Sequence, residues 1–213
     1  QLGDRFGVRT TATIDASALA CDGLLLAVKP QQMKDAVAAL AGKLSKQLII
    51  SIAAGLRVAD IARWLQYPRV VRAMPNTPAL IGCGMTGLYA DPSVDAAGRA
   101  QAEKILAAVG ATLWVTEETQ IDAVTAISGS GPAYVFYFIE AVEAAARGLG
   151  LNDEAARQLT VETFLGASRL AAQSTDSIAT LRERVTSKGG TTEAALQRFV
   201  AQGIAEAIRQ GID

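Results

Sequence analysis

The sequence of 213 residues contains no histidine, which excludes histidine-based catalytic triads, histidine metal sites and histidine proton shuttles. Its two cysteines, Cys21 and Cys83, are too few for a disulfide framework or a cysteine-only metal site. A net charge of −1 offers no basic excess for nucleic acid or an anionic membrane surface. No apolar run reaches the roughly 18 residues of a membrane span. With no secretion signal visible, these features predict a cytoplasmic protein that holds no metal.

Half of the residues are apolar, which excludes a disordered chain and leaves enough material for a sizeable core. The first residue is Gln1 rather than methionine, and the opening Gln-Leu-Gly is typical of a helix end. We therefore expect this chain to be part of a longer one.

The first half of the chain alternates between short apolar runs and helical patterns. Strands are predicted at residues 23–28, 48–52, 70–74, 86–90 and 112–115, and helices at 31–43, 58–66 and 93–109. This alternation is typical of a mostly parallel α/β sheet. The continuous apolar run at 23–28 further predicts a strand buried on both faces.

After residue 116 the strand-like runs end and only helical patterns follow. Helices are predicted at 117–127, 132–147, 153–173, 177–185 and 191–209. We therefore predict two domains, residues 1–116 and residues 117–213. The segment 133–142 is apolar nearly all round, broken only by Glu140, which favours burial in a subunit interface over the alternative of a central core helix.

Three small loops follow the first three predicted strands, at the edge where ligands of parallel sheets bind. They are Ala27-Val28-Lys29-Pro30, residues 51–55 and residues 74–78. Lys29 is their lone cation, placed to meet a phosphate or a ribose, unless it is simply a solvated lysine at a strand end. Asn76 stands between two prolines, where the alternative is a turn residue bonded to its own backbone. No G-x-G-x-x-G motif follows a strand, so a phosphate-binding loop is expected upstream of Gln1.

Two glycine-rich motifs lie in the helical half. In residues 128–132, Ser130 suits a helix N-cap and Pro132 a first helical position, and the paired glycines allow close backbone approach. Residues 186–192 open the last predicted helix with a Gly-Gly loop whose free N–H groups form a cradle for a small carboxylate. The alternative for this second motif is a turn capped by Thr191 or Thr192.

Five segments, taken in order, carry a resemblance to a known family. They are AVKPQ at 27–31, SIAAG at 51–55, RAMPNTP at 72–78, ISGSGPAYVF at 127–136 and VTSKGGTTEAAL at 185–196. Together they closely resemble pyrroline-5-carboxylate reductase, over essentially the whole chain. Compared with that family, the first strand–helix–strand unit and a short C-terminal helical tail are expected to be missing.

The resemblance implies an α/β fold: a Rossmann-type domain, here N-terminally incomplete, followed by an all-helical domain that interlocks with a second copy. It implies a homodimer that assembles further into a decamer, and reduction of Δ1-pyrroline-5-carboxylate to L-proline by hydride from NADPH or NADH. The cofactor-binding residues it implies are Ala27, Val28, Lys29, Pro30, Ala53, Ala54 and Asn76. The substrate-binding residues it implies are Glu118, Gly189, Gly190, Thr191 and Thr192, with the Thr192 hydroxyl facing the ring nitrogen as the catalytic group. Arg184 departs from the asparagine found in many members.

Two other readings remain open from the residues alone. One is another two-domain NAD(P)-dependent reductase or dehydrogenase acting on a small acid. Such enzymes usually carry a catalytic lysine on a helix, whereas Lys188, the only lysine after Lys104, lies in the glycine loop. The other is an inactive dimerising fragment, if the chain truly starts at Gln1. Because the motifs lie in different halves, the substrate site is expected to need both domains or two chains.

Overall fold

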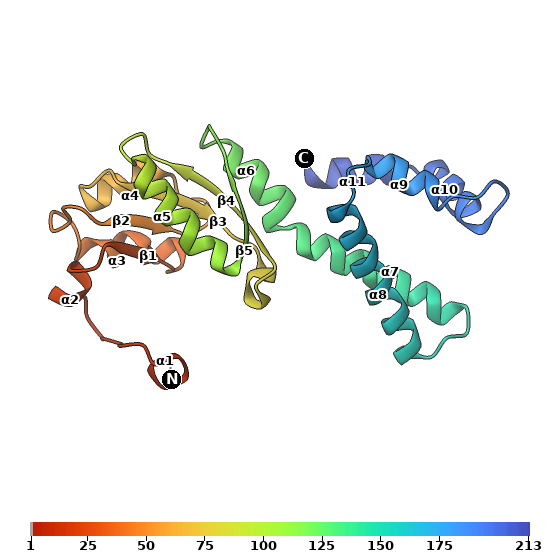
Figure 1. The fold of residues 1–213 in the computed structure, drawn as a ribbon, viewed down its shortest axis with the longest axis horizontal. Helices are drawn as coiled ribbons and strands as arrows, with labels where there is room; N and C mark the ends of the chain where they lie inside the picture. The colour runs from red at the N-terminus through yellow and green to blue at the C-terminus, as the bar shows by residue number, and fades with distance from the viewer. Residues whose placement is uncertain (1) are drawn as a thin grey trace. The chain divides into compact units, whose positions relative to one another are not determined.

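A computed structural model describes residues 2–213, which separate after Pro132 into two compact units (Figure 1). The first unit holds a five-stranded sheet with helices and the second is helical throughout, which confirms the predicted fold class. The sequence-based division lies after residue 116. In the structure the next helix, α6 (Gln120–Val124), packs on the sheet and belongs to the first unit. Ile121 of that helix is fully buried. Val124 packs so closely on Gly87 of the sheet that a Cβ added to Gly87 would lie 2.6 Å from Cγ1 of Val124.

The sheet follows chain order, β1-β2-β3-β4-β5. Its strands are β1 (Gly23–Leu26), β2 (Leu48–Ser51), β3 (Val70–Met74), β4 (Gly84–Ala90) and β5 (Gly110–Trp114). Strands β1, β2 and β3 are parallel, β4 is antiparallel to β3, and β5 is parallel to β4. The prediction of a mostly parallel sheet is confirmed. As a result, β1, β2 and β3 end at one shared edge of the sheet, while β4 and β5 end at the opposite edge.

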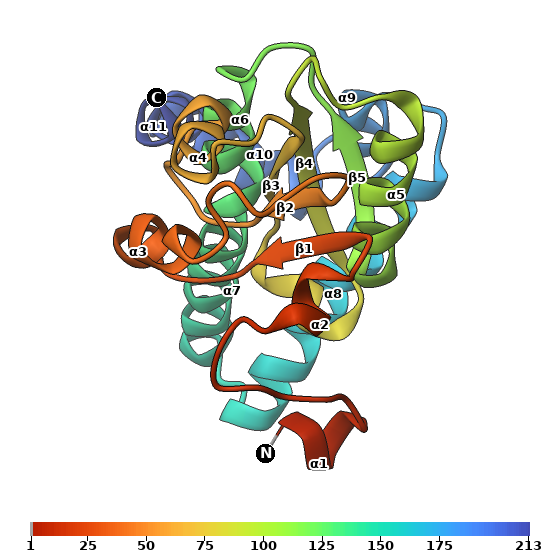
Figure 2. The same ribbon diagram turned by 90° about the vertical axis from the view of Figure 1, so that its left-hand side faces the viewer.

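Helices cover both faces of the sheet, with α3 and α4 on one side and α5 on the other (Figure 2). The first unit's helices are α1 (Leu2–Phe6), α2 (Ala16–Leu19), α3 (Met33–Ala38), α4 (Val58–Leu65), α5 (Ala96–Leu106) and α6. Successive residues of a strand point to opposite faces. Ile49 therefore packs with Ile61 and Leu65 of α4, whereas Ile50 packs with Leu106 of α5. This two-sided burial explains why β2 is apolar up to Ser51 and why β3 is apolar except for Arg72.

Strand β1 is not buried on both faces. The prediction of two-sided burial for residues 23–28 is therefore wrong. The strand lies at the end of the strand order and pairs with β2. Leu24 and Leu26 pack against the core beneath α3 and α4, but Leu25 points to the other face and is 51% exposed. The leucine run itself looks the same whether a strand is central or at an edge, which is why the pattern misplaced it.

The second unit consists of α7 (Gly131–Gly148) from its third residue onward, α8 (Asp153–Gln173), α9 (Ile178–Arg184), α10 (Thr191–Ala201) and α11 (Ile204–Ile212). The predicted single helix at 191–209 is wrong. Gly203 has a φ of 66°, a left-handed conformation that an α-helix interior does not contain, so the chain breaks there and restarts as α11. The apolar periodicity runs through the break, which hides it from pattern analysis.

The start of α7 also differs from expectation. Ser130 is not an N-cap: its backbone is helical, and its N–H donates to the carbonyl of Thr125, five residues back. That bond belongs to a π-helical turn, η4 (Thr125–Gly129), which joins α6 to α7. The expected close approach of backbone holds at Gly129, where a Cβ would come within 2.7 Å of the Met74 side chain.

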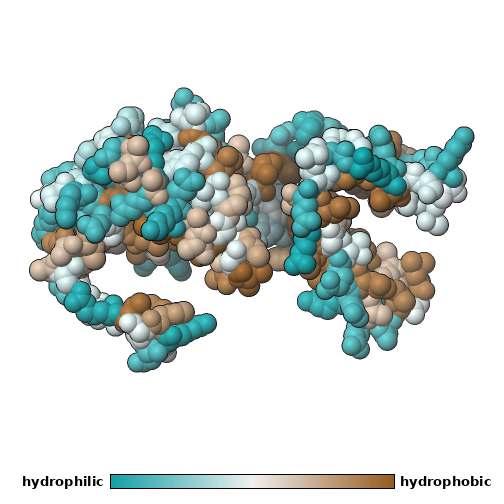
Figure 3. Space-filling view, in the orientation of Figure 1, coloured by the Kyte–Doolittle hydropathy of each residue, from teal (hydrophilic) through white to brown (hydrophobic). Residues whose placement is uncertain are grey.

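The second unit has little core of its own. Among its described residues only Ala156 and Thr160 are buried. Large apolar side chains are exposed instead, and hydrophobic residues lie open along its helices (Figure 3). The most exposed are Phe136, Tyr137, Leu149, Ile178, Val185 and Val200. Exposed apolar side chains in such number are typical of an interaction face. Within residues 2–213, no helix combines the length and apolarity needed to cross a membrane.

Candidate active site

The loops that follow β1, β2 and β3 lie side by side, because these strands are neighbouring and parallel. The pairing continues into the loops, where the Ile52 N–H donates to the Leu26 carbonyl. The predicted cofactor residues of the first two loops are thereby brought together. Of these, Ala27, Val28, Lys29 and Ala54 are exposed, Pro30 is half-buried and Ala53 is buried. Gly55 has a φ of 74°, so the second loop turns at a position that favours glycine.

Asn76, in the third loop, uses its side chain to connect three segments. Its Nδ2 donates to the carbonyl and the Oγ of Ser128, each at 3.2 Å, and its Oδ1 accepts the N–H of Met85 at 2.9 Å. The alternative of a turn residue bonded to its own backbone is therefore wrong. The amide instead ties the end of β3 to the start of β4 and to the π-helical turn η4.

Replacing Asn76 with alanine is expected to destabilise the protein by about 2 kcal/mol, because the Met85 N–H and the Ser128 carbonyl lose their partner. Denaturant unfolding measures this loss. The control is Asn152→Ala, which removes a single exposed N-cap bond of α8 and should cost about 1 kcal/mol. Equal small losses in the two variants would contradict the linking role of Asn76.

The Glu118 carboxylate lies at the start of α4, beside the loop that follows β2. Its Oε1 accepts the N–H of Val58 at 2.7 Å and pairs with Nη1 of Arg72 at 3.2 Å. Arg72 is buried, and its Nη2 lies 3.4 Å from Oδ1 of Asp122. Sequence analysis missed Arg72, although a charged residue inside the apolar run Val-Val-Arg-Ala-Met was the available signal.

The second unit brings Gly189, Gly190, Thr191 and Thr192 together in one turn at the start of α10. The N-cap is Gly190, and no side chain caps the helix, so the alternative that a threonine caps it is wrong. The Gly190 N–H closes a turn onto the Ser187 carbonyl, and the Gly189 N–H donates to Oε2 of Glu193 at 2.6 Å. The expected glycine donors are thus engaged. The N–H groups of Thr191 and Thr192 are the ones that a helix start leaves without an intrahelical partner.

Arg184, the departure from the family pattern, lies at the end of α9. Its guanidinium forms an ion pair with the Asp176 carboxylate in the preceding loop. The pair links the last residue of α9 to the loop before that helix, and α9 leads into the glycine loop.

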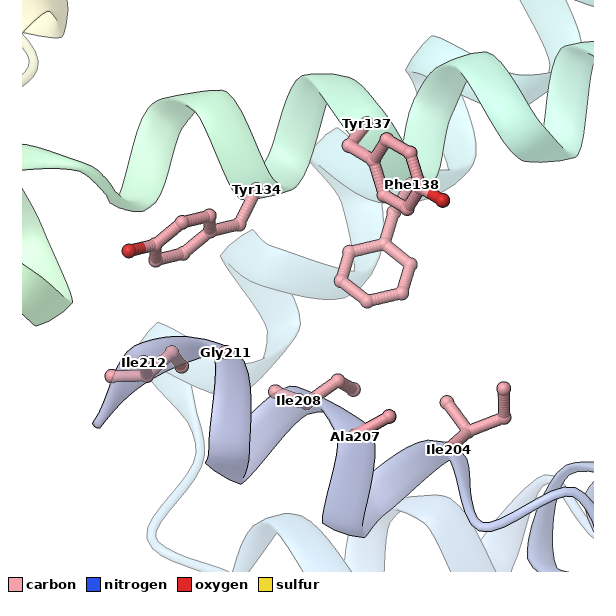
Figure 4. Close-up of a pocket in the computed structure, with 8 residues that line it drawn as sticks. All are labelled: Tyr134, Tyr137, Phe138, Ile204, Ala207, Ile208, Gly211 and Ile212. Carbon is pink, nitrogen blue, oxygen red and sulfur yellow. The ribbon is translucent and has the colours of Figure 1, made fainter.

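A third feature is an apolar cavity of about 320 Å³ between α7 and α11 (Figure 4). The Phe138 ring from α7 and the Ile208 side chain from α11 point toward each other across it. Its lining is Tyr134, Tyr137, Phe138, Ile204, Ala207, Ile208, Gly211 and Ile212. With so few polar groups, it suits an apolar segment of protein rather than a small charged acid.

The exposed residues at the shared edge of β1, β2 and β3 are small or aliphatic, and Lys29 is the one cation of the three loops. Ligands of parallel sheets bind at such an edge. Among residues 2–213, no cluster of three or more acidic or cysteine side chains is arranged to hold a metal ion.

Two family models match the chain. Residues 118–213 match the pyrroline-5-carboxylate reductase dimerisation family, and residues 1–55 match the family described as NADP oxidoreductase, coenzyme F420-dependent.

Individual relatives agree with these matches. The chain is 51% identical over 194 residues to pyrroline-5-carboxylate reductase of Pseudomonas aeruginosa, covering 90% of this chain and 71% of the relative. It is 42% identical over 208 residues to the Haemophilus influenzae enzyme of the same name, covering 96% of this chain and 77% of the relative.

Solved structures are similar as well. A pyrroline-5-carboxylate reductase from Coxiella burnetii superposes with a TM-score of 0.94 at 43% identity, covering 99% of this chain and 79% of the other. The Plasmodium falciparum pyrroline carboxylate reductase, solved with NADP bound, superposes with a TM-score of 0.83 at 28% identity, covering 92% of this chain and 74% of the other.

Proposed function

The chain belongs to the pyrroline-5-carboxylate reductase family, and from this premise we propose that it reduces Δ1-pyrroline-5-carboxylate to L-proline with NADPH or NADH. The observation that carries the proposal is the 51% identity to a reductase of this name over 90% of this chain. The shared edge of three parallel strands supports it, because ligands of parallel sheets bind at such an edge. The reaction is the last step of proline biosynthesis.

The cofactor is assigned to the shared edge of β1, β2 and β3. Ala27, Val28, Lys29 and Pro30 border it on one side, Ala53 and Ala54 form the middle, and Asn76 shapes the third loop. When bound, the nicotinamide supplies the hydride. The protein's part is to hold a flat ring against the backbone of these loops, with Lys29 available for a phosphate or a ribose hydroxyl.

The substrate carboxylate is assigned to the start of α10. Gly189, Gly190 and Thr191 form the loop, and the helix start favours an anion there. The N–H groups of Thr191 and Thr192 are the nearest available donors. Gly189 joins them if the Glu193 carboxylate, which now accepts its N–H, is displaced by that of the substrate.

Thr192 is assigned the catalytic position. A cyclic imine protonated on nitrogen accepts hydride without a strong base, so a chain without histidine is compatible with this chemistry. The Thr192 hydroxyl holds the ring nitrogen in place by a hydrogen bond. An unperturbed threonine is a poor acid and does not itself protonate the imine. Its hydroxyl orients the ring nitrogen and can pass on a proton that is already present.

The direct test measures NADPH oxidation by the purified full-length protein with pyrroline-5-carboxylate, and detects proline as product. Rapid oxidation with stoichiometric proline is expected. A small hydroxy acid with NAD⁺ or NADP⁺ serves as the competing substrate. Turnover of that acid without turnover of pyrroline-5-carboxylate would overturn the proposal.

The protein is a homo-oligomer, as the match to a dimerisation family over residues 118–213 indicates. We further assign a homodimer in which a second copy covers the apolar surface of the second unit and the cavity between α7 and α11. Assembly of these dimers into a decamer is part of the same proposal. Support comes from the unit's nearly absent core and from exposed side chains such as Phe136, which is 64% exposed.

Replacing Phe136 with aspartate is expected to dissociate the oligomer, because a charge at an apolar contact is desolvated without a partner. Sedimentation should show a monomer at concentrations where the unaltered protein is associated. Lys104→Asp, on the exposed surface of α5, is the control and should leave association unchanged. An unaltered oligomer in the Phe136 variant would contradict the assigned surface.

A cytoplasmic location completes the proposal. Its support is the biosynthetic reaction and the two exposed, unpaired cysteines Cys21 and Cys83, which suit a reducing compartment.

A further inference from the structure

Glu118 occupies a junction between three parts of the first unit. It lies between β5 and α6, yet its Oε1 accepts a hydrogen bond from Val58 at the start of α4, sixty residues away in sequence. The same oxygen accepts a charge-assisted bond from Arg72 in β3. The Arg72 side chain is only 6% exposed and that of Glu118 only 21%, so both groups are largely withdrawn from water.

The bond to Val58 fixes one end of the loop at residues 53–57. The other end of that loop is fixed by the sheet, through β2 and the Ile52–Leu26 hydrogen bond. Residues 53–57 include Ala53 and Ala54, which belong to the proposed dinucleotide edge. The Glu118 carboxylate, by holding the Val58 N–H, therefore sets the position of the loop at residues 53–57. A carboxylate at a helix start is also favoured by the helix dipole.

Arg72 holds Glu118 in this position. A charged group buried without a partner is costly, so Arg72 and Glu118 are each stabilised only while paired. Arg72 has a second partner in Asp122, but that side chain is 74% exposed and contributes less. The carboxylate of Glu118 is thus oriented by a rigid strand residue, which is what a positioning group requires.

The hollow beside Glu118 is lined by polar and charged residues, namely Arg57, Arg72, Glu118, Thr119 and Asp122. Within it, Oε1 of Glu118 already accepts the Val58 N–H and the Arg72 guanidinium. The hydrogen bonds of this oxygen are therefore made to the first unit itself.

We infer that Glu118 is a positioning residue for the dinucleotide edge, held by Arg72, in place of the substrate contact that the family resemblance implied. The inference rests on the proposed function. We call the hydrogen bond from the Val58 N–H to Oε1 of Glu118 the clamp. If the inference is right, loss of the clamp weakens cofactor binding, whereas loss of a substrate contact would weaken substrate binding. The two roles therefore separate in measurements on one set of variants.

The test compares Glu118→Ala and Glu118→Gln in the full-length protein. NADPH affinity is measured by fluorescence titration without substrate, and the KM for pyrroline-5-carboxylate by steady-state kinetics. In Glu118→Ala we expect NADPH affinity to fall about tenfold, as one lost charge-assisted bond implies, while the KM for pyrroline-5-carboxylate changes less than about twofold. Glutamine keeps an acceptor oxygen for Val58, so Glu118→Gln should recover part of the affinity.

A second readout needs neither cofactor nor turnover. Amide hydrogen exchange at Val58 is expected to accelerate at least tenfold in Glu118→Ala, because its acceptor is gone. Two controls flank the site. Glu117→Gln removes a neighbouring charge, and Asp122→Asn removes the other partner of Arg72, but the structure gives neither carboxylate a bond to α4. Both should keep the exchange rate of Val58 and the NADPH affinity.

The opposite results overturn the inference. A raised KM for pyrroline-5-carboxylate with unchanged NADPH affinity would assign Glu118 to the substrate after all. Unchanged Val58 exchange and unchanged affinity would show that the clamp is not used. If Glu118→Ala does not fold, Glu118→Gln and Arg72→Lys carry the same comparison. Failure of the unaltered protein to oxidise NADPH with pyrroline-5-carboxylate would overturn the proposed function instead, and Val58 exchange would still report on the clamp.

Discussion

Replacing Thr192 with alanine is expected to lower kcat/KM for pyrroline-5-carboxylate by about a hundredfold or more, the scale on which a positioned proton-transfer or hydrogen-bonding group contributes. The hydroxyl is not needed for the fold, since no side chain caps α10 and the N-cap position belongs to Gly190. Alanine also has the higher helix propensity. Unfolding should therefore be almost unchanged, while steady-state kinetics show the loss, mainly in kcat.

Two companion variants make this result specific. Thr192→Ser keeps the hydroxyl and should recover most of the activity. Thr163→Ala makes the same chemical change at an exposed residue of α8, whose Oγ1 donates to the Leu159 carbonyl, and should keep full activity. If Thr192→Ala retained the unaltered kcat/KM, the assignment of Thr192 as the catalytic residue would be wrong, although the family membership would stand.

The second large effect is on stability. Gly110→Ala is expected to destabilise the protein by about 4 kcal/mol or more, the range reserved for strong backbone conflicts. Gly110 begins β5 with a φ of 143°, in a region that L side chains rarely adopt. A Cβ there would lie 2.0 Å from the Gly84 carbonyl oxygen and 2.4 Å from the Gly84 nitrogen. Since Gly84 and Gly110 are paired, the collision would separate β4 from β5 at their first residues.

Gly23→Ala is the matched control at another strand start. Its nearest neighbour would be the side-chain amide of Gln101 at 3.3 Å, which can move aside, so the cost should stay below about 1 kcal/mol. Denaturant unfolding of the two variants gives the comparison, and failure of Gly110→Ala to fold falls within the expected range. Equal stability of the two would contradict the close backbone contact.

The sequence predicted element types better than their ends. The alternation of apolar runs with helical periodicity located the five strands, and α8 spans the very residues predicted. The misses have local causes. Gly203 interrupts a periodicity that continues on both sides, and Ser130 sits in a π-helical turn rather than at a helix start. Leu25 lies in an apolar run, but its burial depends on neighbours that the run does not specify.

For the candidate site, the sequence identified the loops but not the hydrogen bonds and ion pairs that connect them. Parallel neighbouring strands were enough to bring Lys29 and Ala54 to one edge. The bonds of Asn76 to Ser128 and of Glu118 to Val58 join residues more than fifty positions apart, and no local pattern encodes such pairings. Arg72 was visible as a charge inside an apolar strand, yet its partners became clear only from the fold.

The order of the sheet has a consequence for how the protein is made. Since the strands are arranged as they occur in the chain, each one can join the growing edge as it leaves the ribosome, without waiting for later segments. The helical unit follows the sheet in the chain and has few buried residues of its own. Synthesis therefore presents the sheet before the helical unit. Because the protein is a homo-oligomer, its assembly then depends on the concentration of sister chains.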